Sequence, residues 1–103
     1  MQMFVMDFTY TVSEEQFHKE NSPEMAAKIA TVPGLVWKYW LHSSENKECL
    51  GVYHFADRAS AEAYLVSDWV KGFGSLPGYT IRSTKLYDLI IENSKICRAP
   101  GVK

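Results

Sequence analysis

The 103-residue sequence predicts one α+β domain, in which two helical segments cover one face of a four-stranded antiparallel sheet. Three observations support this prediction. Four segments carry the alternating or strongly apolar patterns of strands, and two segments that begin with helix-capping residues separate them in the order β-α-β-β-α-β. A short polar turn joins the two middle strands. This order is the split βαβ, or ferredoxin-like, arrangement, with the second and fourth strands at the edges of the sheet.

The first strand is expected at residues 2–12, where apolar side chains alternate with more polar ones, as in a strand with one buried face. Ser13 then begins the sequence SEEQ, which is a capping box for a helix. Ser22 followed by Pro23 is a second helix start. The segment therefore contains either one helix that is kinked at Pro23 or two short helices, and a Pro-Gly pair at 33–34 ends it.

A hairpin follows, with strands at 35–43 and 49–56 joined by the polar turn SENK. A turn centred on its Glu-Asn pair sets the cross-strand pairs, which are Trp37 with His54, Tyr39 with Val52, Leu41 with Leu50, Lys38 with Tyr53, Trp40 with Gly51 and Val36 with Phe55. Large apolar side chains then lie on both faces, whereas a sheet with one helical layer should have one polar face. We predict that an identical subunit covers the second face, so that two sheets form a dimeric α/β barrel.

Two residues of this hairpin each have two interpretations. Gly51 either lies beneath the Trp40 ring or leaves room for a ligand beside the indole. Lys38 either protects an edge strand against unwanted pairing, with its stem over an aromatic ring, or steadies an anionic substrate or intermediate.

The second helical segment is expected at residues 58–70, because Asp57 is a good N-cap and a Lys-Gly pair follows the segment. The last strand is expected from Tyr79 to about Ile91. We therefore expect the α+β domain to span residues 1–93 and an irregular C-terminal tail to span 94–103.

Composition and charge argue against several classes of function. The net charge of −1 gives no electrostatic basis for binding nucleic acid or an anionic membrane, and the apolar runs are too short to span a bilayer. Since the first residues also lack the pattern of a signal peptide, we expect a cytoplasmic protein. Cys49 and Cys97 are far apart, and His18, His42 and His54 show no i, i+4 pairing, so we expect neither a disulfide nor a metal site.

Two segments of the sequence resemble a known family. PGLVWKYW at 33–40 and GVYHFADRASAEAYL at 51–65 are similar to the YdhR-like monooxygenases, which share the dimeric α/β-barrel superfamily with the antibiotic-biosynthesis monooxygenases. The resemblance implies a homodimer that oxidises a small phenol- or quinol-type aromatic molecule with O2 and without a cofactor. The superfamily also includes lactone-type isomerases and proteins that only bind ligands. A non-catalytic ligand-binding or stress-response module and an isomerase are therefore the alternatives.

Such an oxidation needs an apolar pocket, a base that titrates near neutral pH and a donor for a developing anion. We expect His54 to be the base, and Lys38 and Tyr53 to be the donors. The predicted pocket walls are Trp37, Trp40, Phe55, Tyr64 and Trp69. For each of these residues the alternative is an ordinary place in the core or in the dimer interface. Because the sequence carries no flavin, nicotinamide or haem signature, we expect no cofactor.

Overall fold

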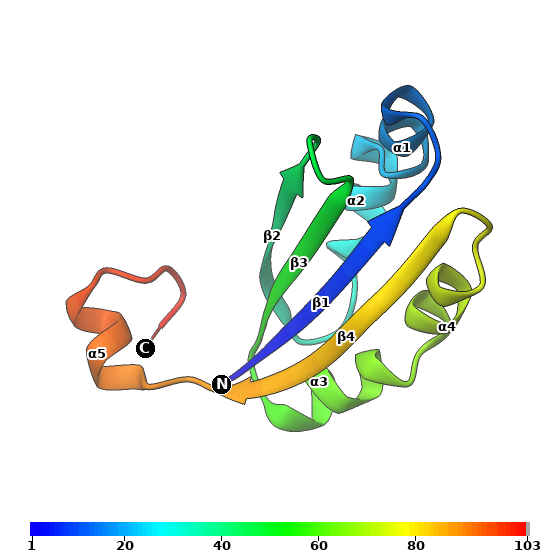
Figure 1. Cartoon of the computed structure of the whole chain (residues 1–103). Coiled ribbons are helices and arrows are strands. Elements are labelled where there is room, and N and C mark those ends of the chain that lie inside the picture. Colours follow the sequence, from blue (N-terminus) through cyan, green and yellow to red (C-terminus); the bar gives the residue numbers. More distant parts are fainter. Residues whose placement is uncertain (103) are drawn as a thin grey trace.

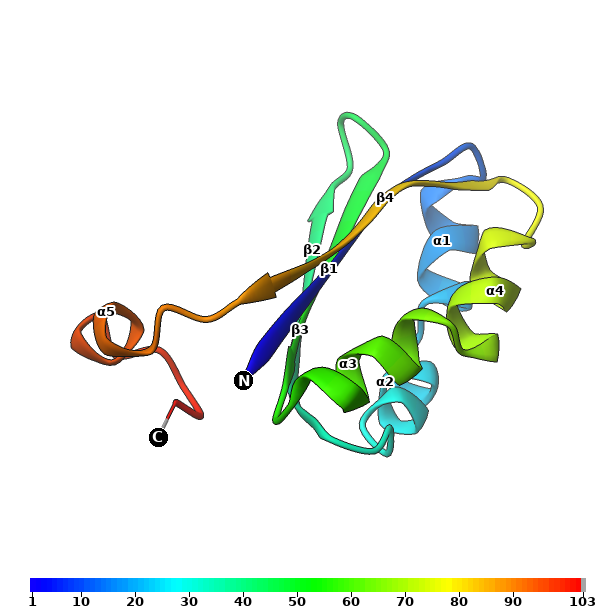
Figure 2. The same cartoon turned by 90° about the horizontal axis from the view of Figure 1, so that it is seen from below.

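The computed structural model describes residues 1–102 and confirms the predicted α+β, ferredoxin-like arrangement (Figure 1). Four strands form one antiparallel sheet in the order β2-β3-β1-β4, with β2 and β4 at the edges as expected. The strands are β1 (Gln2–Tyr10), β2 (Leu35–Ser43), β3 (Glu48–Phe55) and β4 (Tyr79–Asp88). Figure 2 shows that helices α1 to α4 all lie on one side of this sheet. The alternation in β1 explains the core, because Phe4, Met6, Phe8 and Tyr10 all point to the helices and are buried.

The first helical segment consists of two short helices, α1 (Glu14–Glu20) and α2 (Pro23–Ile29). The Ser13 hydroxyl accepts a hydrogen bond from the Gln16 backbone at 3.1 Å and so caps α1. The Ser22 hydroxyl caps α2 in the same way, through the Met25 backbone at 3.2 Å, with proline at the first helical position. Each helix has its own cap, which decides between the two alternatives for this segment.

The prediction of one helix at residues 58–70 was wrong, because two helices form: α3 (Arg58–Leu65) and α4 (Asp68–Gly74). Asp57 caps α3 as expected, through the Ser60 backbone at 2.7 Å. The break lies at Ser67, whose backbone is extended and whose hydroxyl donates to the Tyr64 carbonyl at 2.5 Å. A serine that bonds a nearby carbonyl competes with the helical ladder, which gives the physical reason for the break.

The register of the β2–β3 hairpin agrees with the prediction at five of the six cross-strand pairs, including Trp37 with His54 and Lys38 with Tyr53. The exception is the first pair. The register shifts between Leu35 and Trp37, so Leu35 rather than Val36 lies opposite Phe55. A β-bulge of this kind adds one residue to one strand, which sequence alternation alone does not show.

The C-terminal residues differ from the irregular tail that we expected. Strand β4 ends at Asp88, and Ile91–Ile96 forms a short helix, α5, on the side of the sheet opposite to α1–α4 (Figure 2). The Trp37 indole nitrogen donates to the Pro100 carbonyl at 3.0 Å, so the end of the chain contacts this side of β2. Three other apolar side chains of this sheet face remain exposed: Tyr39, Leu41 and Tyr87 are 52%, 48% and 49% exposed.

Candidate active site

A cavity of about 400 Å³ lies between the sheet and the helical layer. Strands β1, β2 and β3 form its floor, and residues of α2, α3 and α4, together with Asn21 and Leu76 from the connections, form its walls. Its apolar and aromatic lining consists of Met6, Phe8, Met25, Ile29, Trp40, Trp69, Phe73 and Leu76. A few polar side chains reach it, namely Asn21, Lys38, Tyr53, Tyr64 and Asp68. A largely apolar cavity with a few convergent polar groups is the usual form of a small-molecule site.

The alternation of the central strands places the polar groups of the cavity. Lys38 and Tyr53 lie opposite each other on β2 and β3 and face the helices. The Tyr64 side chain comes down from α3 onto the same region, and its hydroxyl donates to the Tyr53 hydroxyl at 3.1 Å. Three polar side chains from three elements therefore meet on one side of the cavity.

The Lys38 amine lies in an unusual environment for a lysine. It is 3.2 Å from the centroid of the Trp40 ring and 4.4 Å from that of Tyr53. In the part of the chain that the structure describes, no carboxylate forms an ion pair with it. Burial lowers the pKa of Lys38 to about 7, because an apolar environment disfavours the ammonium form. A substantial share of this amine is therefore neutral near pH 7 and able to accept a proton.

The two tyrosines of the cavity behave in the opposite way. Burial raises the pKa values of both Tyr53 and Tyr64, so both stay protonated at neutral pH. The two hydroxyls lie 3.1 Å apart and share one hydrogen bond, which uses one of their two protons and leaves the other for an acceptor in the cavity. The cavity thus contains a base near its titration point and a tyrosine pair that can donate one hydrogen bond.

Gly51 lies opposite Trp40 as predicted, but other residues occupy the space above it. A Cβ at this position would lie 2.9 Å from the Tyr53 ring and 3.2 Å from Cε of Lys38. Neither predicted interpretation is therefore complete, since the glycine makes room for the lysine stem and the tyrosine ring. The missing side chain lets Lys38 and Tyr53 lie close together over the strand.

The structure brings together five of the eight residues predicted for the site. Lys38, Trp40, Tyr53, Tyr64 and Trp69 all line the cavity. Phe55 does not line it but is fully buried, and its ring stacks on Tyr53 with centroids 6.2 Å apart.

The other two predicted residues, His54 and Trp37, lie on the opposite face of the sheet. They pair across β2 and β3 as predicted, with their rings edge to face at 5.1 Å. The His54 side chain is completely buried, and neither ring nitrogen has a hydrogen-bond partner in the described residues. A ring on this face does not reach a ligand in the cavity, so His54 does not form one site with Lys38 and Tyr53.

The helical layer supplies cavity residues that the sequence did not single out. Asn21 lies in the break between α1 and α2, and Asp68 begins α4. Both sit at helix ends, and their approach to the cavity depends on how the helices pack on the sheet. The only sequence signal for them was the presence of helix starts nearby.

The family model described as "Putative mono-oxygenase ydhR" matches residues 3–100, which is nearly the whole chain. The chain belongs to the YdhR family. The resemblance seen at residues 33–40 and 51–65 is thereby confirmed over nearly the whole chain. No curated protein sequence matches it.

Solved structures show where else this fold occurs. A variant of SnoaB, a cofactor-independent oxygenase from Streptomyces nogalater, is 17% identical to this protein, with a TM-score of 0.64 over 86% of this chain and 92% of that one. An antibiotic biosynthesis monooxygenase is 11% identical, with a TM-score of 0.63 over 87% of this chain and 99% of that one. At these identities the likeness establishes a shared fold. In residues 1–102, no helix has the length and apolar character needed to cross a membrane.

Proposed function

We propose that this YdhR-family protein is a cofactor-independent monooxygenase that oxidises a small phenol- or quinol-type aromatic molecule with O2. The observation that carries the proposal is the Lys38 amine, whose pKa burial lowers to about 7 and which lies inside an aromatic cavity, 4.4 Å from the centroid of the Tyr53 ring. The cavity of about 400 Å³ has room for a flat molecule of a few fused rings. The family name and the oxygenase with the same fold agree with this reaction class.

In the proposed reaction the substrate supplies the electrons. The neutral Lys38 amine takes a proton from an acidic CH2 or OH group, and the resulting anion passes one electron to O2. The two radicals combine to form a carbon–oxygen bond, which gives a peroxide. Loss of water then breaks the O–O bond, so that one oxygen atom stays on the substrate as a carbonyl and the other leaves as water.

Five of the cavity residues have a defined part in this proposal. Lys38 is the base, and the Tyr53 hydroxyl donates to the oxyanion of the intermediate. Trp40, Tyr64 and Trp69 form aromatic walls that hold the ring system and keep water away. His54, on the other sheet face, takes no part in the chemistry, which replaces our expectation that it is the base.

We also propose that the protein is a homodimer. The sheet face opposite the helices exposes Tyr39, Leu41 and Tyr87, which lie on its two edge strands. An apolar sheet face of this kind is stabilised when a second sheet packs on it. Light scattering at micromolar concentration should give twice the mass of one chain, and a monomer at that concentration would refute this part of the proposal.

The decisive experiment measures oxygen consumption by the untagged, chelator-treated protein with a panel of naphthols, anthrones and hydroquinones. We expect uptake above the buffer background, one carbonyl product, and a rate that rises with pH through about pH 7 as Lys38 loses its proton. The variant Lys38→Met should abolish uptake.

The matched control is Lys28→Met, which removes an exposed lysine of α2 and should leave the rate unchanged. Uptake that survives in Lys38→Met would remove Lys38 as the base. If no compound is consumed but several raise the Tm, the cavity would be the site of a binding protein rather than an oxygenase.

A further inference from the structure

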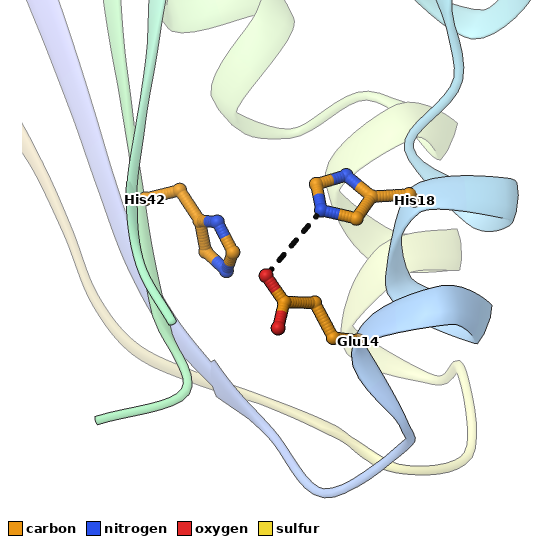
Figure 3. Close-up of side chains that lie close together, drawn as sticks. All are labelled: Glu14, His18 and His42. Carbon is orange, nitrogen blue, oxygen red and sulfur yellow. Dashed lines mark ion pairs between the residues drawn. The ribbon is translucent and has the colours of Figure 1, made fainter. Parts of the chain in front are cut away.

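Three side chains with metal-binding groups meet at the open end of the helical layer. Glu14 and His18 lie one turn apart on α1, and His42 comes from β2 (Figure 3). One ligand atom from each lies within 4.8 Å of the other two. The cluster is separate from the cavity described above, which none of its members lines.

Packing between α1 and the sheet creates this cluster. Phe17, the buried residue of α1, stacks on the His42 ring with centroids 4.6 Å apart and planes 15° apart. The Tyr10 hydroxyl also bonds Nε2 of His42 at 2.6 Å. These two contacts hold the imidazole on the helical side of β2, where it faces the neighbours of Phe17 on α1. His18 then meets His42 edge to face, with centroids 5.5 Å apart.

From this arrangement we infer that Glu14, His18 and His42 form a binding site for a divalent transition-metal ion of the Zn²⁺ class. Two imidazoles and one carboxylate are a ligand set that such ions prefer, whereas Mg²⁺ and Ca²⁺ require mainly oxygen ligands. Ligand atoms about 2.1 Å from a tetrahedral ion lie about 3.4 Å from one another. To bind an ion, the ligand atoms of the three side chains must therefore approach one another by little more than about 1 Å. All three side chains are exposed and have the freedom to make this movement.

The site is open on one side. Three protein ligands leave at least one coordination position of a tetrahedral ion for water or an exchangeable anion. His18 and His42 also line a groove of about 580 Å³ whose other walls include Phe17 and Trp40. A molecule bound in this groove has access to the free position on the ion.

A surface ion pair explains only part of the cluster. Glu14 and His18 lie 3.7 Å apart as an i, i+4 pair, which is a common and weak contact on helices. Glu15 and Lys19 form an equivalent pair on the same helix, also at 3.7 Å, but without a third ligand. Glu15 is therefore a control of the same type, in the same turn of α1.

The test is calorimetric titration of ZnCl2 into the full-length, untagged and chelator-treated protein. We expect one ion per chain in the micromolar range, and with Co²⁺ a visible absorption band typical of nitrogen and oxygen ligands. Mutation of residues that support metal ligands typically weakens metal affinity by roughly 10–100-fold. Glu14→Gln and His18→Ala each remove a ligand itself, so each should weaken Zn²⁺ binding at least as much. Glu15→Gln should bind like the unchanged protein.

His42→Phe tests the third ligand, because a phenyl ring can still stack on Phe17 while it offers no nitrogen. This variant also loses the bond from the Tyr10 hydroxyl, so its Tm without metal is its own reference. Zn²⁺ should give it none of the rise in Tm that it gives the unchanged protein. Absence of micromolar Zn²⁺ binding, or equal affinity in the His18→Ala and Glu15→Gln variants, would overturn the inference. Neither result depends on oxygen consumption, so the two proposals fail or succeed separately.

Discussion

The buried amine of Lys38 should make the protein less stable at neutral pH than it would be with an uncharged side chain. In the unfolded chain this lysine titrates near 10.5, and in the folded protein near 7. Folding at pH 7 therefore has to remove a proton from the amine or bury the charge. A pKa difference of this size corresponds to about 4 kcal/mol at pH 7, since each pKa unit is about 1.4 kcal/mol.

The pH dependence of this cost has a definite sign. Between pH 7 and 10.5 the unfolded chain binds more protons at this residue than the folded protein does, so the stability contributed by Lys38 rises with pH. The penalty is complete below pH 7 and disappears above 10.5. Lys38→Met, which has no charge and a similar stem, should therefore be more stable than the unchanged protein at neutral pH and about equal to it near pH 10.

Urea unfolding of both proteins at a series of pH values measures this difference, with the chain concentration held constant because the proposed dimer couples stability to concentration. Lys28→Met serves as the control, and its difference from the unchanged protein should not vary with pH in this way. If the advantage of Lys38→Met were absent at neutral pH, or equally large near pH 10, the amine would be charged in the folded state. It would then also be unsuitable as a base near pH 7.

Three further changes test the packing of the cavity, its proposed oxyanion donor and the cap of helix α3. Gly51→Ala should lower stability by about 1–3 kcal/mol in urea unfolding, because the new methyl group meets Tyr53 and Lys38, whereas Gly72→Ala has open space around its Cβ and should not destabilise. Tyr53→Phe should slow oxygen uptake by roughly 100- to 1,000-fold at unchanged pH dependence, as loss of one oxyanion donor does; an unchanged rate would exclude its hydroxyl as the donor. Asp57→Ala should lower the Tm through the lost cap of α3, and a Tm equal to that of the unchanged protein would contradict the role of this cap.

Alternation and turn chemistry predict the sheet well, because both are local properties of the sequence. The SENK turn sets the hairpin register, and with it the pairing of Lys38 with Tyr53 and of Trp37 with His54. Period-two alternation separates these pairs onto two faces but does not say which face the helices cover. Because both faces of this hairpin are apolar, His54 was as good a candidate for the cavity as Lys38 until the helices were placed.

Features that arise from packing between distant segments were not predictable in this way. The i, i+4 spacing test considered only the three histidines, so it did not consider Glu14, which forms an i, i+4 ion pair with His18 on α1. His42 joins them because the Phe17 ring stacks on it from a different element. The break at Ser67 likewise depends on the hydrogen bond from the Ser67 hydroxyl to the Tyr64 carbonyl, and not on the pattern of apolar residues.

The division of the helical layer into four short helices has a consequence for ligand entry. Helices α1 to α4 have only seven or eight residues each, and isolated helices shorter than about 12–15 residues are marginal in water. Each therefore stays folded through its contacts with the sheet and can open alone while the sheet remains intact. We therefore expect a bulky ligand to enter the cavity more readily when one of these roof helices opens, and amide hydrogens of α2 and α4 to exchange with solvent faster than those of β1. A ligand that fills the cavity should slow this exchange in the roof and leave the sheet unchanged.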